Sequence, residues 1–323
     1  MSDNHFLGID LGGTNIRGVV AALDGDRQAI VARDERPTPR EGADAIVRAL
    51  ADCARAAVRD AGIPLHEVVA IGCAAPGPLD HRTGLVHEAP NLAGFKEFPL
   101  ASRLSDALDG ATVFVDRDTA MAGVGEAMAG AARGVRDFVY VTVSTGLGGT
   151  IVSGGRMLRG ASNTAGEIGH WPVAFQTDVA RDASDGMPRC GCGSFGCAES
   201  FAAGRNLSEA YGVADAAAVF AAAARGEQRA QALVARAERA LANLAVGLVN
   251  VVNPSLIVVG GSIADNQPAH VIEPMRRGIA ERAFRAPASA VRVVPAALGS
   301  DVGMLGAVLA ARERASGRGE WFL

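Results

Sequence analysis

A short unit of strand, glycine turn and strand occurs twice in this chain, and it limits the folds that the chain can adopt. The two copies, given as strand, turn and strand, span residues 6–10, 11–14 and 16–22, and then 138–143, 144–149 and 150–152. In each copy an apolar run stops at a glycine-rich step before a second apolar run begins, which is typical of a hairpin. Two such units predict two similar domains that face each other.

Strand and helix patterns alternate along the rest of the chain. Further strands are expected at 68–73, 112–115, 256–259 and 291–295, and helices at 40–61, 119–132 and 301–315. This alternation predicts an α/β architecture. Glycine turns follow strands in both halves, and open α/β sheets bind ligands at the carboxyl ends of their strands. A ligand is therefore expected in the crevice between the halves.

Length and charge exclude several classes of protein. The chain has 323 residues, which indicates two domains. Its formal net charge is −4 and it contains no block of Lys or Arg, so nothing favours binding to nucleic acid. Its one lysine, Lys96, lies between Phe95 and Glu97, which excludes the Gly-Lys-Ser/Thr step of a Walker A loop.

The sequence also predicts a protein of the cytoplasm that contacts no membrane. Asp3 lies at the start and a strand pattern follows at once, so we expect no secretory signal. The most apolar stretch, 241–261, contains polar residues and a proline, which predict a helix, a turn and a buried strand rather than a membrane span. The interrupting residues are Asn243, Asn250, Asn253 and Pro254.

The glycine turns have a possible ligand in common, a nucleotide phosphate. Without Cβ atoms, glycine lets backbone N–H groups approach phosphate oxygens closely. Asp10, beside the first turn, could orient Mg²⁺, which proteins usually hold with one or two carboxylates plus phosphate. The alternative is that these are ordinary hairpin glycines. A third pair, Gly260-Gly261, follows another apolar strand and favours the phosphate interpretation.

Three cysteines within eight positions indicate a metal site. Cys190, Cys192 and Cys197 are separated mainly by glycines, and no export signal accompanies them, which favours metal over disulfides. Zinc prefers four N or S ligands in a tetrahedron, and His170 is the histidine in the same loop-rich region. Three thiolates and one imidazole leave no open position, so this zinc would be structural. The alternative is three reduced cysteines without a metal.

Three carboxylates near these features are candidates for chemistry. Glu167 and Glu199 flank the metal loop, where they could bind the hydroxyls of a polyhydroxylated ligand or be solvated surface residues. Asp118 precedes an Ala-rich helix and could be its N-cap.

Together these segments resemble the ROK family of sugar kinases and sugar-responsive repressors, within the actin-like ATPase superfamily. The resemblance covers nearly the whole chain, and its most specific part is the signature Cys-x-Cys-Gly-x-x-Gly-Cys-x-Glu. The matching segments are 8–14, 76–78, 91–92, 116–118, 144–149, 166–170, 190–199, 259–261 and 299–306.

The resemblance implies an actin-like, ribonuclease H-like fold with a cleft between two domains. It implies a small N-terminal α/β domain at 1–117, on which the C-terminal helix at about 301–323 packs, and a larger α/β domain at 118–300 with the zinc loop. It also implies a homodimer and an ATP-dependent hexokinase that phosphorylates the 6-hydroxyl of a hexose, such as glucose, N-acetylglucosamine, mannose or fructose.

The resemblance also assigns roles to single residues. Asp118 would be the catalytic aspartate that takes the proton of the 6-hydroxyl. The residues expected around the sugar are Gly77, Asn91, Arg117, Asp118, Glu167, His170 and Glu199. Those expected at ATP and its Mg²⁺ are Asp10, Gly12, Gly13, Thr14, Thr145, Gly146, Gly260 and Gly261. His170 would bind zinc through one ring nitrogen and face the sugar with the other.

One residue departs from the family pattern. Arg117 stands where the family usually has an asparagine that helps to hold the sugar. Its guanidinium could turn away and pair with a carboxylate such as Asp116, which is the outcome we expect, or point at a sugar that has an extra acceptor group.

The sequence does not determine the preferred sugar, and it does not decide between ATP and polyphosphate as the donor. The alternative functions are a sugar-responsive regulator and a kinase-inactive sugar sensor. A repressor of this family carries an additional N-terminal helix-turn-helix, for which the strand at residue 6 leaves no room.

Overall fold

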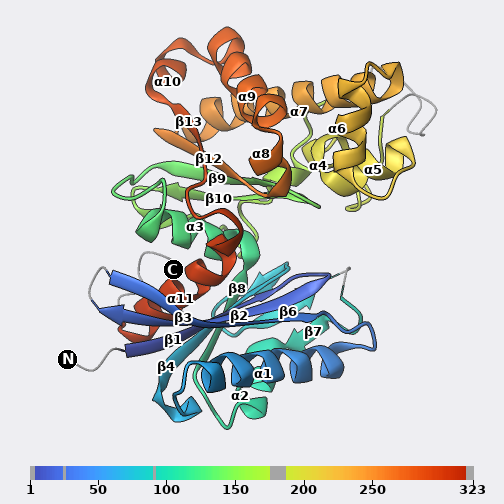
Figure 1. The fold of residues 1–323 in the computed structure, drawn as a ribbon. Coiled ribbons are helices and arrows are strands. Elements are labelled where there is room, and N and C mark those ends of the chain that lie inside the picture. The colour runs from blue at the N-terminus through green and yellow to red at the C-terminus, as the bar shows by residue number, and fades with distance from the viewer. Residues whose placement is uncertain (1–3, 25–26, 90–91, 175–186, 318–323) are drawn as a thin grey trace. The chain divides into compact units, whose positions relative to one another are not determined.

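The computed structural model describes residues 4–24, 27–89, 92–174 and 187–317. The chain forms two compact units. Unit 1 comprises Met1–Gly130, Arg159–Ala165 and Asp301–Leu323, and unit 2 comprises Ala131–Leu158 and Gly166–Ser300. Each unit contains a five-stranded sheet with helices packed on it (Figure 1).

Unit 1 is built on a sheet in the order β3-β2-β1-β4-β8. Its strands are β1 (Asn4–Leu11), β2 (Asn15–Asp24), β3 (Arg27–Pro37), β4 (Val68–Ala75) and β8 (Val113–Arg117). β1, β2 and β3 are antiparallel neighbours, whereas β1, β4 and β8 run parallel. A small second sheet consists of β5 (Leu79–Asp80), β6 (Leu85–Glu88) and β7 (Lys96–Pro99). The helices are η1 (Leu65–Glu67), α1 (Ala43–Asp60), α2 (Leu100–Ala107), α3 (Asp118–Ala129) and α11 (Val302–Ala315).

Helices cover both faces of the unit 1 sheet, and the alternation of side chains along β1 explains why. Leu7 and Ile9 point into the core shared with α1, where they pack in one cluster with Leu50. Phe6, on the opposite face, belongs to the cluster that includes Val308 of α11. Successive side chains of a strand point to opposite faces, so β1 contributes to two hydrophobic layers.

Two glycines let α11 lie directly on the strands. A Cβ at Gly8 would come within 2.3 Å of the Met304 carbonyl oxygen, and one at Gly72 within 2.0 Å of the Ala307 carbonyl oxygen. Side chains at these positions would force α11 away from the sheet, because Cβ contacts of this length do not occur in packed interiors.

Unit 2 has a sheet in the order β11-β10-β9-β12-β13. Its strands are β9 (Phe138–Val143), β10 (Leu147–Ser153), β11 (Arg156–Met157), β12 (Leu256–Gly260) and β13 (Arg292–Pro295). The helices in the sequence before β12 are η2 (Ile168–His170), α4 (Ala198–Ala202), α5 (Gly204–Tyr211), α6 (Ala216–Ala224) and α7 (Gln228–Val252). Those after β12 are α8 (Ser262–Asn266), α9 (Pro268–Arg282) and α10 (Arg285–Ala290), and η4 (Gly299–Asp301) leads into α11.

The two sheets share one plan, which confirms the predicted repeat. In both, an antiparallel hairpin is extended on one side by a further strand and on the other by two parallel strands. The glycine turns at 11–14 and 144–146 are the turns of the two hairpins, β1–β2 and β9–β10. The predicted helix, turn and buried strand at 241–261 are the end of α7, Asn253 in the left-handed conformation, and β12.

Unit 1 continues past residue 117, where the family resemblance implied the end of the first domain. α3 belongs to unit 1 because it packs on α11, and a Cβ at Gly306 would come within 1.8 Å of the Met121 carbonyl oxygen. α11 ends at Ala315, and residues 318–323 lie outside the described part of the chain.

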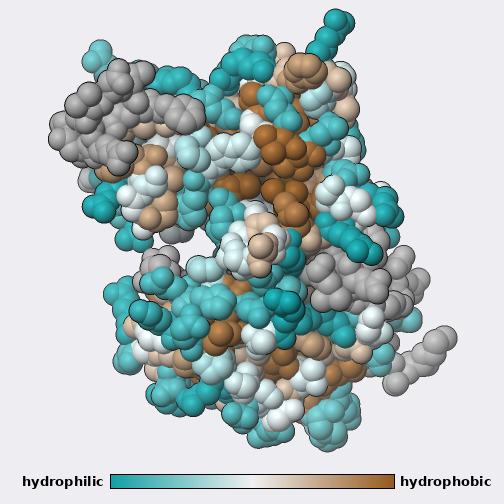
Figure 2. Space-filling model, turned by 180° about the vertical axis from the view of Figure 1, so that it is seen from behind, coloured by the Kyte–Doolittle hydropathy of each residue, from teal (hydrophilic) through white to brown (hydrophobic). Residues whose placement is uncertain are grey.

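Within the described ranges, no single helix has the length and apolar composition needed to cross a membrane. α5 and α6 pass that test only as a pair, with a bend of 63° between them. Seen from behind, hydrophilic residues cover much of the surface, and the largest hydrophobic area lies on unit 2 (Figure 2).

A buried histidine lies among polar groups of unit 1. His81 is 6% exposed, and its Nδ1 lies 2.9 Å from Asn163 Oδ1. Asn163 Nδ2 donates to the Leu79 carbonyl oxygen, so Oδ1 faces the ring and Nδ1 must be the protonated nitrogen. Burial, followed by the positive charge of Arg159, lowers the pKa of His81.

This histidine is predicted to make the fold less stable in acid. Below about pH 6.5 the unfolded chain binds a proton at His81 while the native state resists it. The free energy of unfolding should fall as the pH drops through that window, by at most about 1.4 kcal/mol per pH unit for this group. Denaturant unfolding at pH 7.5 and 5.5 measures the loss, and His81→Gln should reduce it. An equal loss in both proteins would contradict the prediction.

Candidate functional site

Three candidate residues of unit 1 lie at or just after the carboxyl ends of neighbouring parallel strands. Asp10 lies near the end of β1, Gly77 follows β4, and Asp118 follows β8. The register pairs Asp10 with Ala74 and Ala74 with Asp116, so these ends meet at one edge of the sheet. That edge is where open α/β sheets bind ligands.

The glycine turn after β1 is held by backbone contacts. The Gly12 N–H donates to the Asn15 carbonyl oxygen at 3.0 Å, and the Thr38 hydroxyl donates to the Gly12 carbonyl oxygen at 2.7 Å. Thr38 N–H also donates to Thr14 O at 2.8 Å. Gly13 is exposed, with open space where a Cβ would be. The turn is therefore fixed from behind while its outer side remains accessible.

Asp10 lies under the first turn of α11. A Cβ on Gly303 would come within 3.3–3.4 Å of the Asp10 carboxyl atoms, a tight contact that glycine avoids. Burial raises the pKa of Asp10, and the nearby Arg17 partly opposes this. A carboxylate in such surroundings gains from a bound cation.

At the end of β8 the structure excludes one alternative, for Asp118, and corrects one expectation, for Arg117. Asp118 is not the N-cap of its helix: the N-cap is Arg117, and Asp118 is the first helical residue, exposed, with its Oδ1 accepting from Thr119 N–H at 2.7 Å. Arg117 does not ion-pair with Asp116, which binds Arg159 instead. The buried Arg117 donates from Nη2 to the Ala165 carbonyl oxygen at 2.6 Å, and its Cγ and Cδ lie against Gly77. Asn91 lies outside the described residues.

In unit 2 the four predicted metal ligands come together. One ligand atom from each of His170, Cys190, Cys192 and Cys197 lies within 4.8 Å of all the others. His170 Nδ1 is 3.4 Å from Cys190 Sγ, and Cys192 Sγ is 3.7 Å from Cys197 Sγ. Tetrahedral zinc with Zn–S bonds of about 2.3 Å would separate two sulfurs by about 3.8 Å, so these spacings fit that ion.

Glu199 connects this cluster to the second glycine turn. It lies in the first turn of α4, directly after the cysteine loop. Its Oε2 accepts from Leu147 N–H at 3.2 Å, and its Oε1 lies 3.8 Å from Cys190 Sγ.

Glu167 is exposed, and its carbonyl oxygen accepts from His170 N–H at 3.1 Å. The same short segment therefore presents Glu167 and the imidazole of His170.

The second glycine turn and the glycines after β12 are neighbours in unit 2. β9 and β12 are parallel, and Thr142 pairs with Gly260. The hydroxyls of Ser144 and Ser262, just beyond the two strand ends, are 2.9 Å apart. Gly261 has φ +97°, and a Cβ there would come within 2.6 Å of Thr142 Oγ1, so glycine is required.

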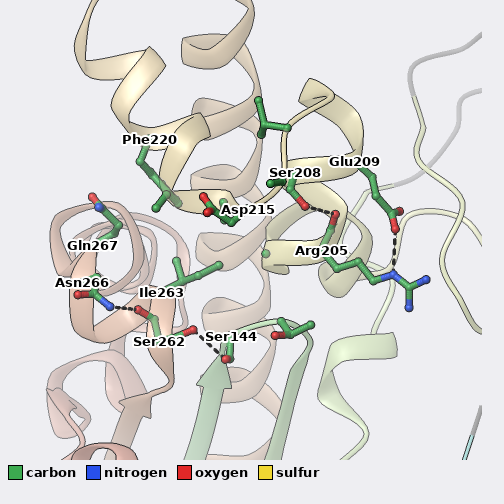
Figure 3. A pocket seen from close by; sticks show the side chains of 16 residues that line it. Ser144, Arg205, Ser208, Glu209, Asp215, Phe220, Ser262, Ile263, Asn266 and Gln267 are labelled. Carbon is green, nitrogen blue, oxygen red and sulfur yellow. Dashed lines mark hydrogen bonds and ion pairs between the residues drawn. The ribbon is translucent and has the colours of Figure 1, made fainter. Parts of the chain in front are cut away.

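A cavity of about 800 Å³ opens at these strand ends, and α5, α6 and α8 surround it (Figure 3). Thr145 is the member of the predicted ATP set that lines it. Ser144 also belongs to the predicted glycine turn, whereas sequence reasoning missed other lining residues, which include Arg205, Glu209, Asp215, Phe220, Ser262, Ile263, Asn266 and Gln267. Arg205 is paired with Glu209 in the view of Figure 3. Gly204, the first residue of α5, donates to the Ser144 carbonyl oxygen at 2.8 Å, a contact between distant segments that no local sequence pattern indicates.

The pattern that defines the ROK family matches residues 6–314. The chain belongs to the ROK family. It is similar to a glucokinase of Halalkalibacterium halodurans, with 29% identity over 95% of this chain and 94% of the relative. It is also similar to an N-acetylmannosamine kinase of Escherichia coli, with 32% identity over 95% of this chain and 98% of the relative.

Solved structures of ROK proteins share the fold. A ROK hexokinase from Thermus thermophilus has a TM-score of 0.78 and 36% identity, covering 97% of this chain and 99% of that one. A ROK glucokinase from Streptomyces griseus, in complex with glucose and AMPPNP, has a TM-score of 0.78 and 28% identity, covering 96% and 99%. The chain therefore has the actin-like ATPase fold of these ROK proteins, as the sequence predicted.

The ROK segment that presents Glu167 and His170 depends on a glycine. A Cβ at Gly169 would come within 1.9 Å of the Leu147 carbonyl oxygen, so Gly169→Ala must displace η2 or β10. We expect the free energy of unfolding to fall by about 1–3 kcal/mol, measured by denaturant titration. Gly191→Ala, in the cysteine loop, is the matched control because open space surrounds that position. Equal stability of the two variants would contradict this packing.

Proposed function

We propose that this protein transfers the γ-phosphoryl group of ATP to the 6-hydroxyl of a hexose. The observation that carries the proposal is the cavity at the carboxyl ends of β9 and β12, lined by Thr145 of the predicted phosphate turn and large enough for a nucleoside. Its sugar-kinase relatives and its ROK family membership support the same activity. The protein is thus a phosphotransferase with a hydroxyl acceptor.

Asp118 is the proposed general base. Phosphoryl transfer requires positioned reactants, stabilisation of phosphate charge, and a group that accepts the proton of the attacking hydroxyl. Asp118 is exposed at the start of α3, so its carboxylate is accessible to a sugar. As the 6-oxygen attacks the γ-phosphorus and the bond to the β-phosphate oxygen breaks, the hydroxyl proton moves to Asp118.

The hexose hydroxyls are proposed to bind Glu167, Glu199 and His170, with Gly77 and Asn91 as further contacts. Carboxylates accept hydrogen bonds from hydroxyls in fixed directions, and the Leu147 N–H holds Glu199 in one orientation. His170 Nδ1 faces Cys190, which leaves Nε2 for a sugar oxygen.

ATP rather than polyphosphate is the proposed donor. The cavity contains the charged side chains of Arg205, Glu209 and Asp215, and Arg205 is already paired with Glu209 at 2.9 Å. The surplus negative charge of the lining disfavours a long polyanion and suits a neutral nucleoside. Asp10, Gly12, Gly13, Thr14 and Gly146 would surround the phosphates, with Gly260 and Gly261 on the adenosine side.

Two metals are proposed. Asp10 would hold Mg²⁺ together with phosphate: its partial burial raises its pKa, and a bound cation would stabilise the charged carboxylate. When bound, Mg²⁺ neutralises phosphate charge. Zinc would be held by His170, Cys190, Cys192 and Cys197, whose spacings fit a tetrahedron with no open position. Its role would be to fix the segment that presents Glu167 and Glu199.

The kinase proposal is tested by measuring ADP release with glucose, N-acetylglucosamine, N-acetylmannosamine, mannose and fructose, and with ATP or polyphosphate as donor. At least one hexose should be phosphorylated with ATP. Asp118→Asn should lower kcat by about 10²–10⁴-fold with little change in sugar KM or in stability, because it removes the basic carboxylate alone. Asp109→Asn, an exposed aspartate of the same unit, is the control. Sugar binding without turnover in the wild type would instead favour a kinase-inactive sensor.

The zinc proposal predicts about one zinc ion per chain by elemental analysis. Cys192→Ser should lose the metal and raise the KM for sugar, because the segment with Glu167 and Glu199 would loosen. Cys53→Ser is the matched control: Cys53 is buried in unit 1, where its thiol donates to the Asp34 carbonyl oxygen as a hydroxyl also could. Native protein without zinc, whose three loop thiols all react freely, would overturn the assignment.

A further inference from the structure

Asp116, two residues before Asp118, forms a buried ion pair with Arg159. Asp116 is 5% exposed, and Arg159, its partner, is 9% exposed. Arg159 donates from Nη1 to Asp116 Oδ1 at 2.9 Å and from Nη2 to Oδ2 at 2.6 Å. Oδ1 also accepts from the Arg117 backbone N–H at 2.8 Å. One carboxylate thus receives three hydrogen bonds at the end of β8.

The partner arginine begins a short closed loop of unit 1, Arg159–Ala165. The Ala165 N–H donates to the Arg159 carbonyl oxygen at 3.0 Å, which joins the two ends of the loop. The Ala165 carbonyl oxygen accepts from Arg117 Nη2 at 2.6 Å, and in the middle of the loop Asn163 binds His81 and the Leu79 carbonyl oxygen. The loop is therefore fixed to the β8–α3 junction at both ends.

Net stability alone does not account for a pair of this kind. Removing two charges from water costs several kcal/mol per ion, so a buried ion pair contributes little compared with apolar residues of similar volume. Its advantage is direction, since a two-pronged contact between guanidinium and carboxylate defines both the distance and the plane of the partners. Here that direction is imposed on Asp116, and through the Arg117 N–H on the backbone that turns into α3.

The orientation of this backbone determines where the Asp118 carboxylate points. Asp118 is the first residue of α3 and accepts from Thr119 N–H, so its side chain follows the start of the helix. A general base must lie within hydrogen-bond reach of the hydroxyl, and a displacement of about 1 Å can cost as much as 10²-fold in rate.

We propose that Arg159 and Asp116 are positioning residues, which orient Asp118 for proton transfer without touching the substrate. This inference rests on the proposed function, in which Asp118 is the general base. It adds a loop from the middle of the sequence to the machinery of the reaction.

The test uses two variants that leave neither member of this ion pair as a lone buried charge. Arg159→Lys keeps the positive charge but cannot make the two-pronged contact. The double variant Asp116→Asn/Arg159→Met removes both charges together, while the asparagine can still accept from the Arg117 N–H. Each should lower kcat by about 10–100-fold and leave the KM for ATP unchanged, because the cavity proposed for the nucleoside is in unit 2 and neither residue is among those proposed at the phosphates. In the double variant, the pH of half-maximal kcat on the acid side should stay within a few tenths of a unit.

Arg55→Lys is the matched control. Arg55 contacts Asp109 at 3.0 Å in the same unit, but Asp109 lies before β8 begins rather than at its carboxyl end. This variant should keep the wild-type kcat. Unfolding in denaturant, measured on every variant, identifies those that are folded under the assay conditions.

The outcomes separate the two proposals. Wild-type kcat in folded Arg159→Lys and in the folded double variant, with Asp118→Asn inactive, would overturn the positioning role and leave the kinase proposal standing. Should the double variant fail to fold, Arg159→Lys alone decides. Wild-type kcat in Asp118→Asn would overturn both proposals.

Discussion

Parallel pairing of strands is the constraint on which the candidate site depends. Because β1, β4 and β8 run in the same direction, their carboxyl ends meet at one edge and bring Asp10, Gly77 and Asp118 to it from distant parts of the chain. Unit 2 repeats the arrangement with β9 and β12, whose ends carry the Ser144 turn and Gly261. One plan, used twice, thus provides an edge with Asp118, the proposed base, and an edge with the cavity proposed for the nucleoside.

Close packing keeps these edges in place. α11 packs on the sheet of unit 1 at Gly8 and Gly72. In the first turn of α11, Gly303 lies next to the Asp10 carboxyl group. In unit 2 the close packing occurs at Gly169 and Gly261. A Cβ added at either position would come within 3 Å of a neighbouring segment of the chain. Several glycines of this protein are therefore needed for close packing. Gly13 differs, because open space surrounds the position that its Cβ would take.

Much of the fold was predictable because it follows from local patterns. Apolar runs, glycine turns and the cysteine spacing indicated the hairpins, the alternating strands and helices, and the group of His170 with Cys190 and its neighbours, and the structure brings those residues together. The sequence could not show that Arg159 rather than Arg117 pairs with Asp116, since that depends on a loop folded back over many residues. The cavity residues on α5, α6 and α8 were missed for the same reason, because none carries a local signature.

The most direct test of this account is the position of the phosphate in the product. The protein, ATP, Mg²⁺ and each hexose would be incubated together, and the product examined by phosphorus–proton correlation NMR. A base at Asp118 that acts on the 6-hydroxyl predicts coupling of phosphorus to the two protons on carbon 6 of the sugar. Coupling to the proton on carbon 1, or free phosphate with no sugar phosphate at all, would contradict it.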